Sequence, residues 1–351
     1  MIAIHNQPGS FSDRWISYCE EHRIQYRTVD IFDHSIISCL RRLKVTGILF
    51  HISDHMAPRT RLAARSVCQS LEAAGIEVFP NLASYWHCDD KIAQHYLLEA
   101  LDVPRCKTYI FYSRKEGYEW AATAEFPKVF KLRCGSGSTN VQLIRSQRDA
   151  ERLVRSMFGR GMKATSGLVS DLSTKLYKHS KKRDWIATLK RLPATATNVA
   201  LQALMTPRER GYAYFQDFLP NNEFDTRVTV IGSRAFSFRR FVRPDDFRAS
   251  GSGRPDHDPD AIDLRCLRLA FETSKRLGSQ CMAFDFVFDM NHEPMILEMC
   301  YAFVPDFVYE CPGSWTPDLV FHPGQRWPQD VMLENFLQTE ASQHPTPSLL
   351  E

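Results

Sequence analysis

The first eighty residues alternate short apolar runs with longer stretches in which apolar positions recur at helical spacing. The apolar runs predict four strands, at residues 2–5, 25–30, 47–50 and 76–80. The stretches between them predict three helices, at residues 14–22, 36–43 and 59–74. Strands that alternate with helices favour a small parallel sheet. The fold class predicted for the chain is therefore α/β (α+β), opening with a Rossmann-like unit.

Polar side chains follow the third predicted strand. His51, Asp54 and His55 come directly after Phe50. Parallel sheets bind ligands beyond the carboxyl ends of their strands, so these three residues are candidates for substrate contact. They are equally compatible with an ordinary polar loop, and the pattern alone leaves both interpretations open.

The pattern changes twice along the rest of the chain. A second unit combines a predicted helix at 90–101 with strands near 107–112 and 128–133, and a third unit is rich in Phe and in strand-like alternation. The expected division is 1–82, 83–154, a basic helical insertion at 155–210, 211–337 and a loose tail at 338–351. A chain of 351 residues exceeds what one core usually organises, which agrees with several units.

Two acidic residues occupy facing strands of a predicted hairpin. Residues 282–288 and 295–300 alternate around a polar loop, with Asp285 on the first strand and Glu298 on the second. A turn centred between Asn291 and His292 places these carboxylates opposite each other, and the pattern puts Glu298 on the same face as Ile296 and Cys300. Two facing carboxylates repel unless a cation lies between them, so Asp285 and Glu298 are predicted Mg²⁺ ligands. An exposed acidic pair is the alternative.

A glycine- and serine-rich loop joins two further strands. Lys131 lies near the end of the incoming strand, and the loop residues are Gly135, Ser136, Gly137 and Ser138. Glycines let backbone N–H groups wrap an anion, so the loop is a candidate phosphate cover, with Lys131 as a positive charge beside it. A flexible hairpin tip is the competing interpretation, and the loop has neither the P-loop nor the dinucleotide-binding motif.

A third motif places a strand before a Pro-Asn-Asn break. Main-chain groups of Gln216, Asp217, Phe218 and Leu219 are suited to hydrogen-bond the edge of an adenine, and Glu223 is suited to accept bonds from ribose hydroxyls. If the next hairpin turns at Gly232-Ser233, Asp225 faces Arg240 and Arg227 lies near Phe238. This arrangement would bring arginines to the phosphate path.

The net charge of +3 conceals a segregation of charge. Residues 155–210 contain twelve Lys and Arg residues against three Asp and Glu residues, a surplus of nine, so the remainder of the chain carries −6. This basic segment is predicted to be helical at 171–192 and 197–204. It suits an anionic glycan, a membrane surface or an acidic protein, or it is a solvated helical face. Few aromatic residues interleave its charges, so no nucleic acid is expected as a partner.

Composition and cysteine usage indicate that the protein is folded and in which cellular compartment it is expected. The hydrophobic fraction of 44% and the charged fraction of 24% are those of a folded protein rather than a disordered one. The ten cysteines form no Cys-x-x-Cys pair, which argues against a disulfide framework or a zinc site. No secretory signal or run of about 18 apolar residues is visible, and we expect a cytoplasmic protein.

Taken in order, these motifs resemble the ATP-grasp family of carboxylate–amine ligases. The resemblance covers about residues 1–337 outside the basic segment. It rests on Asp90-Lys91 opening the second unit, on Lys131 before the glycine loop, on the seven-residue spacing from Gln216 to Glu223 and on the thirteen-residue spacing from Asp285 to Glu298. Asp225-Thr-Arg227, Arg239-Arg240 and Asp246-Phe247-Arg248 look most like the branch that adds amino acids to carboxylates, of the ribosomal-protein-modifying or glutathione-synthetase-like type.

The resemblance implies a fold and a chemistry. The fold would be a small parallel-sheet domain of the pre-ATP-grasp type, followed by two α+β subdomains that grip ATP. ATP with one or two Mg²⁺ ions would convert a carboxylate to an acyl phosphate, and an amine would then attack to form an amide. Lys91 and Lys131 would hold the α and β phosphates. Arg227, Arg240 and Arg248 would bind the carboxylate or stabilise the transferring phosphoryl group.

The substrate and two alternative functions stay open. The partners expected are a small carboxylate, such as a uronic acid or an amino-acid-containing glycan precursor, and an amine. A kinase that phosphorylates a hydroxyl is one alternative, and a nucleotide-binding scaffold without turnover is another. Family members usually carry Asn where this chain has Cys300, so a second metal ion is in doubt, because a thiol is a poor Mg²⁺ ligand. Cys300 is either a redox-sensitive thiol or, as the sequence favours, a small buried apolar residue.

Overall fold

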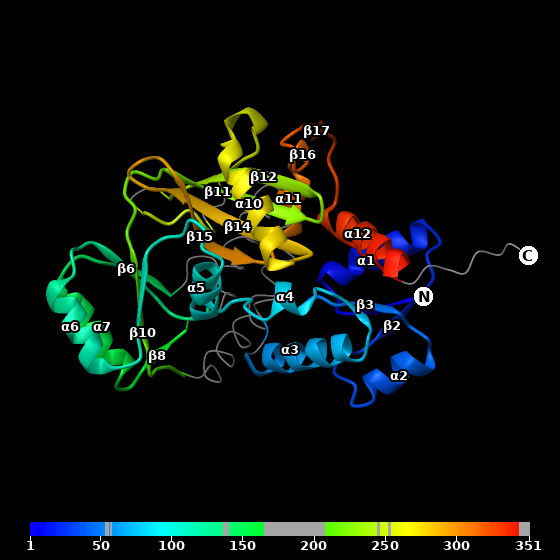
Figure 1. The fold of residues 1–351 in the computed structure, drawn as a ribbon, viewed down its shortest axis with the longest axis horizontal. Coiled ribbons are helices and arrows are strands. Elements are labelled where there is room, and N and C mark those ends of the chain that lie inside the picture. Colours follow the sequence, from blue (N-terminus) through cyan, green and yellow to red (C-terminus); the bar gives the residue numbers. More distant parts are fainter. Residues whose placement is uncertain are drawn as a thin grey trace, which may run out of the picture.

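The computed structural model describes residues 1–52, 56, 58–135, 140–164, 208–243, 246–251 and 254–343. The two helices expected within the basic segment, at 171–192 and 197–204, lie outside these residues. The described chain forms three larger sheets, each with its own helices, and one two-stranded sheet, and Figure 1 labels their elements. In the part of the chain that is described, no helix is both long and apolar enough to span a bilayer.

The N-terminal unit is a four-stranded parallel sheet, as the alternation of strands and helices predicts. Its strand order is β2 (Tyr26–Val29), β1 (Ile2–His5), β3 (Gly47–Leu49), β4 (Glu77–Phe79). The helices are α1 (Phe11–Glu21), α2 (Ile36–Arg42), α3 (Pro58–Ala73) and the short α4 (Leu82–Tyr85). Both faces of the sheet are buried: Ala3 and Ile48 belong to the cluster that includes α2 and α3, whereas Ile4 and Leu49 pack with α1.

The central unit is a four-stranded antiparallel sheet in the order β5 (Thr108–Phe111), β10 (Ala213–Asp217), β6 (Lys128–Lys131), β7 (Val141–Ile144). Its helices are α5 (Lys91–Ala100), α6 (Arg114–Thr123) and α7 (Gln147–Met157), and a short pair, β8 (Met162–Lys163) and β9 (Arg208–Glu209), flanks it. Ala121 of α6 and Val154 of α7 pack on Phe130 and Phe215 of the sheet. This apolar layer fixes β6 and β10, which supply residues of the site.

The C-terminal unit is a seven-stranded sheet in the order β15 (Pro294–Cys300), β14 (Cys281–Phe288), β11 (Phe224–Ile231), β12 (Arg234–Phe241), β16 (Gly313–Trp315), β17 (Phe321–Pro323), with β13 (Pro255–Asp256) paired to β12. A 3₁₀ turn, η1 (Pro259–Ala261), precedes α10 (Leu264–Leu277), and α11 (Pro305–Tyr309) and α12 (Pro328–Gln343) follow. Ala270 of α10 packs with Val228 and Phe284 of the sheet, so one face of the sheet is core.

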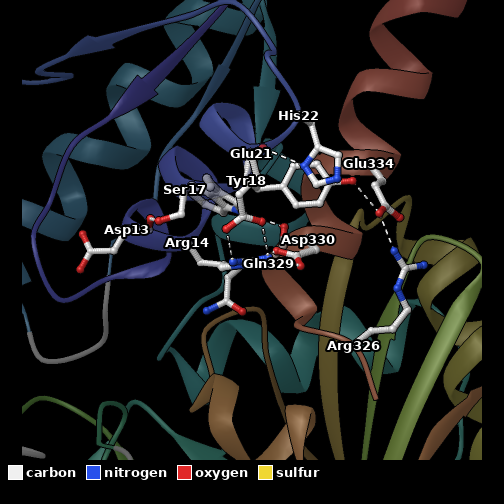
Figure 2. A network of polar contacts seen from close by, with 11 residues as sticks. Asp13, Arg14, Ser17, Tyr18, Glu21, His22, Arg326, Gln329, Asp330 and Glu334 are labelled. Atoms are coloured by element: carbon white, nitrogen blue, oxygen red, sulfur yellow. Dashed lines mark hydrogen bonds and ion pairs between the residues drawn. The ribbon is translucent and has the colours of Figure 1, made fainter. Parts of the chain in front are cut away.

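A network of charged and polar side chains joins α1 to α12 (Figure 2). Arg14 donates from Nε and an Nη to Asp330, at 2.7 and 2.8 Å, and also pairs with Glu21 at 2.9 Å. Tyr18 donates to Glu334 at 2.8 Å. Beneath these contacts the Trp15 indole donates to a main-chain carbonyl of α12 at 3.1 Å. The last helix of the chain is thereby fastened to the first.

Both hairpin alignments proposed from the sequence are present. In β11 and β12, Asp225 lies opposite Arg240 and Arg227 opposite Phe238, because the turn falls at Gly232-Ser233. In β14 and β15, Asp285 lies opposite Glu298.

The second hairpin reaches its alignment through a β-bulge that was not predicted. The register shifts between Asp285 and Phe286, and Phe286 lies opposite Ile296. The expectation that Ile296 shares a face with Glu298 is therefore wrong, because Ile296 is buried in the core while Leu297 and Glu298 both reach the cleft described below. A bulge places two consecutive residues against one, which re-aims the side chains that follow it.

The unit boundaries differ from the sequence-based division at three points. Helix α7 runs through residue 155, so the first basic residue of the proposed insertion belongs to the central unit. Strand β10 was grouped with the C-terminal unit but lies between β5 and β6 in the central sheet. Helix α12 continues through Gln343, so the loose tail expected from residue 338 does not begin there. The buried Val331, Met332 and Phe336 anchor that helix to the N-terminal core.

Candidate functional site

A cleft opens between the central and C-terminal sheets, with about 940 Å³ of empty space, open solvent included. Its lining comes from β6, β7, β10 and the start of α5 on one side, from β11, β14 and β15 on the other, and from the connecting loops. The cleft brings together most of the residues singled out in the sequence: Lys91, Lys131, Gly135, Gln216, Asp217, Phe218, Leu219, Arg248, Asp285 and Glu298.

One part of the cleft is an apolar slot edged by main chain. Val129, Val287 and Leu297 line it together with the segment from Gln216 to Leu219. Gln216 donates from Nε2 to the Thr108 hydroxyl at 3.1 Å, which fixes the end of β10. Apolar walls with a few main-chain polar groups are the usual surroundings of a planar heterocycle.

Lys91 occupies the first turn of α5, where Asp90 is the N-cap. Its Nζ lies 3.0 Å from Oε1 of Glu298 and donates to the main-chain oxygen of Gly135 at 2.7 Å. Burial opposes the charge on this lysine, but Glu298 and Asp89 outweigh burial and raise the pKa of Lys91 above its ordinary value. Lys91 is therefore a fixed cation that links Glu298 of β15 to the root of the glycine loop.

Lys131 is the second cation of the cleft. It ends β6 and is only 5% exposed. Burial lowers the pKa of Lys131, and the attraction of Glu298 offsets this effect only in part, while Lys91 adds to it. No carboxylate within the described ranges forms an ion pair with Lys131. The site thus holds a buried positive charge that an anionic ligand would neutralise.

The root of the glycine loop is tied to the start of α5. Gly135 donates its N–H to Asp89 at 2.7 Å, and Arg61 of α3 pairs with the same carboxylate. A second ion pair nearby joins Arg133 to Asp90, the N-cap of α5. The loop residues Ser136, Gly137 and Ser138 lie outside the described residues. Gly135, where this loop begins, is connected through Asp89 to Arg61 of α3 in the N-terminal unit.

Two carboxylates that line the cleft form a tetrad with two guanidinium groups, of which Arg240 is buried and Arg227 half-buried. Arg227 donates to both oxygens of Asp285, at 2.7 and 2.8 Å. Arg240 donates to both oxygens of Asp225, at 2.7 and 2.6 Å, and an Nη of the same arginine lies 2.8 Å from Asp285. The two charges of each sign balance, so the tetrad is neutral as a group.

The pKa shifts of the two aspartates follow from this arrangement. Burial alone would raise the pKa of Asp285, but Arg227 and Arg240 outweigh it and hold the pKa well below its usual range. Asp225 has one close arginine, and burial raises its pKa above the ordinary value although Arg240 opposes the rise. Asp285 is therefore the more firmly ionised carboxylate, although both aspartates line the cleft.

The carboxylates present fit a magnesium ion that is shared with phosphate. Asp285 and Glu298 are cross-strand neighbours that line one cleft. A carboxylate has about four lone-pair positions, and the arginines use three of those on Asp285. Mg²⁺ takes one or two protein carboxylates and completes its shell with water and phosphate oxygens. In the described part of the chain, no group of three His, Cys, Asp or Glu residues is placed to hold a metal.

Several predicted residues lie apart from the cleft lining. Glu223 is exposed, although its neighbours Asn222 and Phe224 line the cleft. Arg227 and Arg240 contact Asp285 rather than the empty space. His51 is buried and its ring stacks on Phe11 at 3.8 Å, while Asp54 and His55 lie outside the described residues.

The sequence did not single out three groups that shape the site. Asp89 and Arg61 anchor Gly135, and nothing in their spacing marks them, because the contact joins different units. Asn222 donates to the main-chain oxygen of Phe288 at 2.9 Å and so fastens the β10–β11 connection to β14. The Pro-Asn-Asn break is the available signal for Asn222, but the sequence pattern predicts only an interruption between two strands there.

The fold is similar to those of several solved ATP-grasp structures. The biotin carboxylase of Campylobacter jejuni, solved as a β-γ-ATP complex, matches 99% of this chain and 72% of its own length, at 13% identity and a TM-score of 0.57. The D-alanine–D-alanine ligase of Bacillus anthracis matches 97% of this chain and 98% of its own, at 12% identity and a TM-score of 0.53. The ATP-grasp ligase PsnB, complexed with a minimal precursor, matches 96% and 98%, at 12% identity and a TM-score of 0.54.

Comparison by sequence adds no family to this result. No family model matches the chain, and no curated protein matches it significantly. The structural matches establish the fold: the chain has the ATP-grasp fold, an N-terminal parallel sheet followed by antiparallel α+β subdomains.

Proposed function

We propose that the chain is an ATP- and Mg²⁺-dependent ligase that joins a small carboxylate to an amine. The observation that carries the proposal is the buried Lys131, which lies in the cleft close to Lys91 and forms no ion pair within the described residues. Glu298 compensates the buried charge of Lys131 only in part, and such a charge destabilises the fold, so the cleft favours a ligand that brings several negative charges. A nucleoside triphosphate brings those charges, and its base matches the apolar slot.

Each group of the cleft has a role in this proposal. Lys91 and Lys131 bind phosphate oxygens, and the loop that starts at Gly135 covers them. The main chain from Gln216 to Leu219 recognises the adenine edge, and Glu223 reaches the ribose hydroxyls from the rim. Asp285 and Glu298 hold magnesium, which when bound neutralises charge on the phosphate oxygens.

The arginines divide into two roles. Arg248 lines the cleft and pairs with Asp246 at 2.7 Å, so we assign to it the contact with the substrate carboxylate or the transferring phosphoryl group. Arg227 and Arg240 act through Asp285, whose orientation they fix with three hydrogen bonds. In the reaction the carboxylate takes the γ-phosphoryl group of ATP to give an acyl phosphate and ADP. The amine then displaces phosphate and forms the amide.

The proposal is tested by product analysis. Purified protein is given ATP, Mg²⁺ and panels of carboxylates and amines, beginning with uronic acids and amino acids, and ADP, phosphate and amide are measured separately. We expect ADP and phosphate in equal amounts with one carboxylate–amine pair. Lys131→Met should abolish this turnover, whereas Lys115→Met, at an exposed lysine of α6, should not change it.

Other products would identify the alternatives. ADP with a phosphorylated product and no phosphate release would identify a kinase. Nucleotide binding without turnover across the whole panel would favour a scaffold. Full turnover by both Lys131→Met and Asp285→Asn would contradict the assignment of the site.

A further inference from the structure

Two cysteines from distant parts of the sequence meet beside the cleft. The sulfur of Cys88 lies 3.6 Å from that of Cys300, although 212 residues separate them. Cys88 lies between α4 and α5, and Cys300 is the last residue of β15. A disulfide brings two sulfurs to about 2.05 Å, so the gap to be closed is about 1.5 Å. No disulfide joins the described cysteines in this structure.

The position of Cys300 differs from the apolar role that the sequence favours. Cys300 and Cys88 are both half-buried, whereas six of the other cysteines are buried: Cys19, Cys68, Cys106, Cys266, Cys281 and Cys311. An oxidant of small size can reach a half-buried thiol more readily than one in the core. The pair thus combines proximity with partial access.

We propose that Cys88 and Cys300 form a reversible disulfide under oxidation by a peroxide. One thiol reduces hydrogen peroxide and becomes a sulfenic acid with release of water, and the second thiol displaces a second water to form the S–S bond. The two sulfurs together supply the two electrons that reduce the peroxide. A dithiol reductant reverses the step by thiol–disulfide exchange.

The bond would lie beside the two charged groups that face each other across the cleft. Cys88 is three residues before Lys91, and Cys300 is two residues after Glu298, whose Oε1 is 3.0 Å from the lysine Nζ. The disulfide would therefore hold α5 against β15 and keep Lys91 on Glu298. This consequence rests on the proposed function, because Lys91 and Glu298 must turn toward phosphate and magnesium when the nucleotide binds.

Peptide mapping tests the site without any nucleotide. The full chain is treated with hydrogen peroxide, alkylated and digested without reduction, and cross-linked peptides are identified by mass. We expect a Cys88–Cys300 peptide, a loss of 2 Da from the intact chain, and reversal by dithiothreitol. Cys300→Ser and Cys88→Ser should each abolish this peptide, whereas Cys39→Ser, at a half-buried cysteine of α2, should leave it unchanged.

Peptide mapping can also contradict the proposed disulfide. Oxidation of the wild-type chain that yields only sulfinic acids, or linked peptides of other cysteine pairs, would overturn the proposal, and this result does not depend on whether the variants fold. The consequence for the cleft is measured as the affinity for a fluorescent ATP analogue with Mg²⁺. We expect it to fall at least tenfold on oxidation and to recover on reduction.

These two measurements separate the two ideas. A disulfide that leaves the analogue affinity unchanged would overturn the coupling to the cleft. A chain that forms the disulfide but binds no analogue even when reduced would contradict the proposed function and support the disulfide site.

Discussion

The α1–α12 interface and the cleft both contain basic and acidic side chains. They differ in how far each charge is compensated by a partner of opposite sign. At the interface Asp330 accepts from Arg14 and Glu334 accepts from Tyr18, and Glu21, which also pairs with Arg14, is half exposed to solvent (Figure 2). Around the cleft, four cations face three carboxylates, and Lys131 is the cation that forms no ion pair among the described residues. The first arrangement holds two helices together. The second leaves a positive charge without an ion-pair partner next to the cleft, where an anionic ligand can bind.

Removing a carboxylate from each region gives the largest expected contrast. Asp285→Asn leaves Arg227 and Arg240 with Asp225 as their one remaining carboxylate in the tetrad, so we expect a loss of about 3–5 kcal/mol in the free energy of unfolding. The matched variant Asp330→Asn removes a less buried partner of Arg14 and should cost about 1 kcal/mol. Chemical denaturation measures both.

Nucleotide affinity should separate the same two variants. Asp285→Asn should weaken binding of the Mg²⁺–ATP complex, and Asp330→Asn should not. Equal losses of stability in the two variants would mean that the tetrad is no more dependent on compensation than the interface.

Lys131→Met tests whether the surplus charge serves binding rather than stability. Methionine preserves most of the volume but removes a buried ion, so the free energy of unfolding without nucleotide should rise by about 1 kcal/mol. Loss of a charged hydrogen bond to phosphate should weaken nucleotide binding by about 2 kcal/mol, roughly 30-fold. Calorimetry and a nucleotide titration measure the two effects. A drop in stability would show that Lys131 has a structural partner in the folded protein.

The pH dependence gives a smaller effect with a definite sign. The pKa of Lys131 is lowered in the folded chain by burial, so between that pKa and about 10.5 the unfolded chain binds more protons. The lysine's penalty to folding is therefore present at lower pH and is relieved as pH rises through this window. The stability difference between Lys131→Met and the wild type should shrink from pH 8 to pH 10.5. A difference that grows over this range would contradict the lowered pKa.

The features that could be predicted from the sequence are those encoded locally. The β11–β12 register followed from one turn at Gly232-Ser233, and Asp225 therefore met Arg240 as expected. Asp285 met Glu298 as well, but through a bulge that alternation cannot reveal. The same pattern consequently failed for Ile296, which a strict alternation placed on the wrong face.

Features that depend on contacts between distant segments were missed. Strand β10 follows the basic segment in sequence, yet it pairs with β5 and β6, because strand order is decided by tertiary packing and not by local periodicity. Tertiary packing likewise brings together the Arg61–Asp89–Gly135 contacts and the Cys88–Cys300 pair, which local periodicity does not reveal. Glu223 shows the converse: its spacing from Gln216 matches the pattern of the family that the sequence resembles, but its side chain is exposed and does not line the cleft.

Glu21→Gln gives the smallest expected effect and tests the other side of the comparison. Its carboxylate pairs with Arg14 at 2.9 Å, but the side chain is 50% exposed and Arg14 keeps its two bonds to Asp330. Screening by solvent limits such a pair to less than about 0.5 kcal/mol, and the loss should shrink further in high salt. Denaturation at two salt concentrations measures it. A loss of several kcal/mol in the free energy of unfolding would mean that the interface, like the cleft, depends on each of its charges. The proposed difference between the two regions would then be wrong.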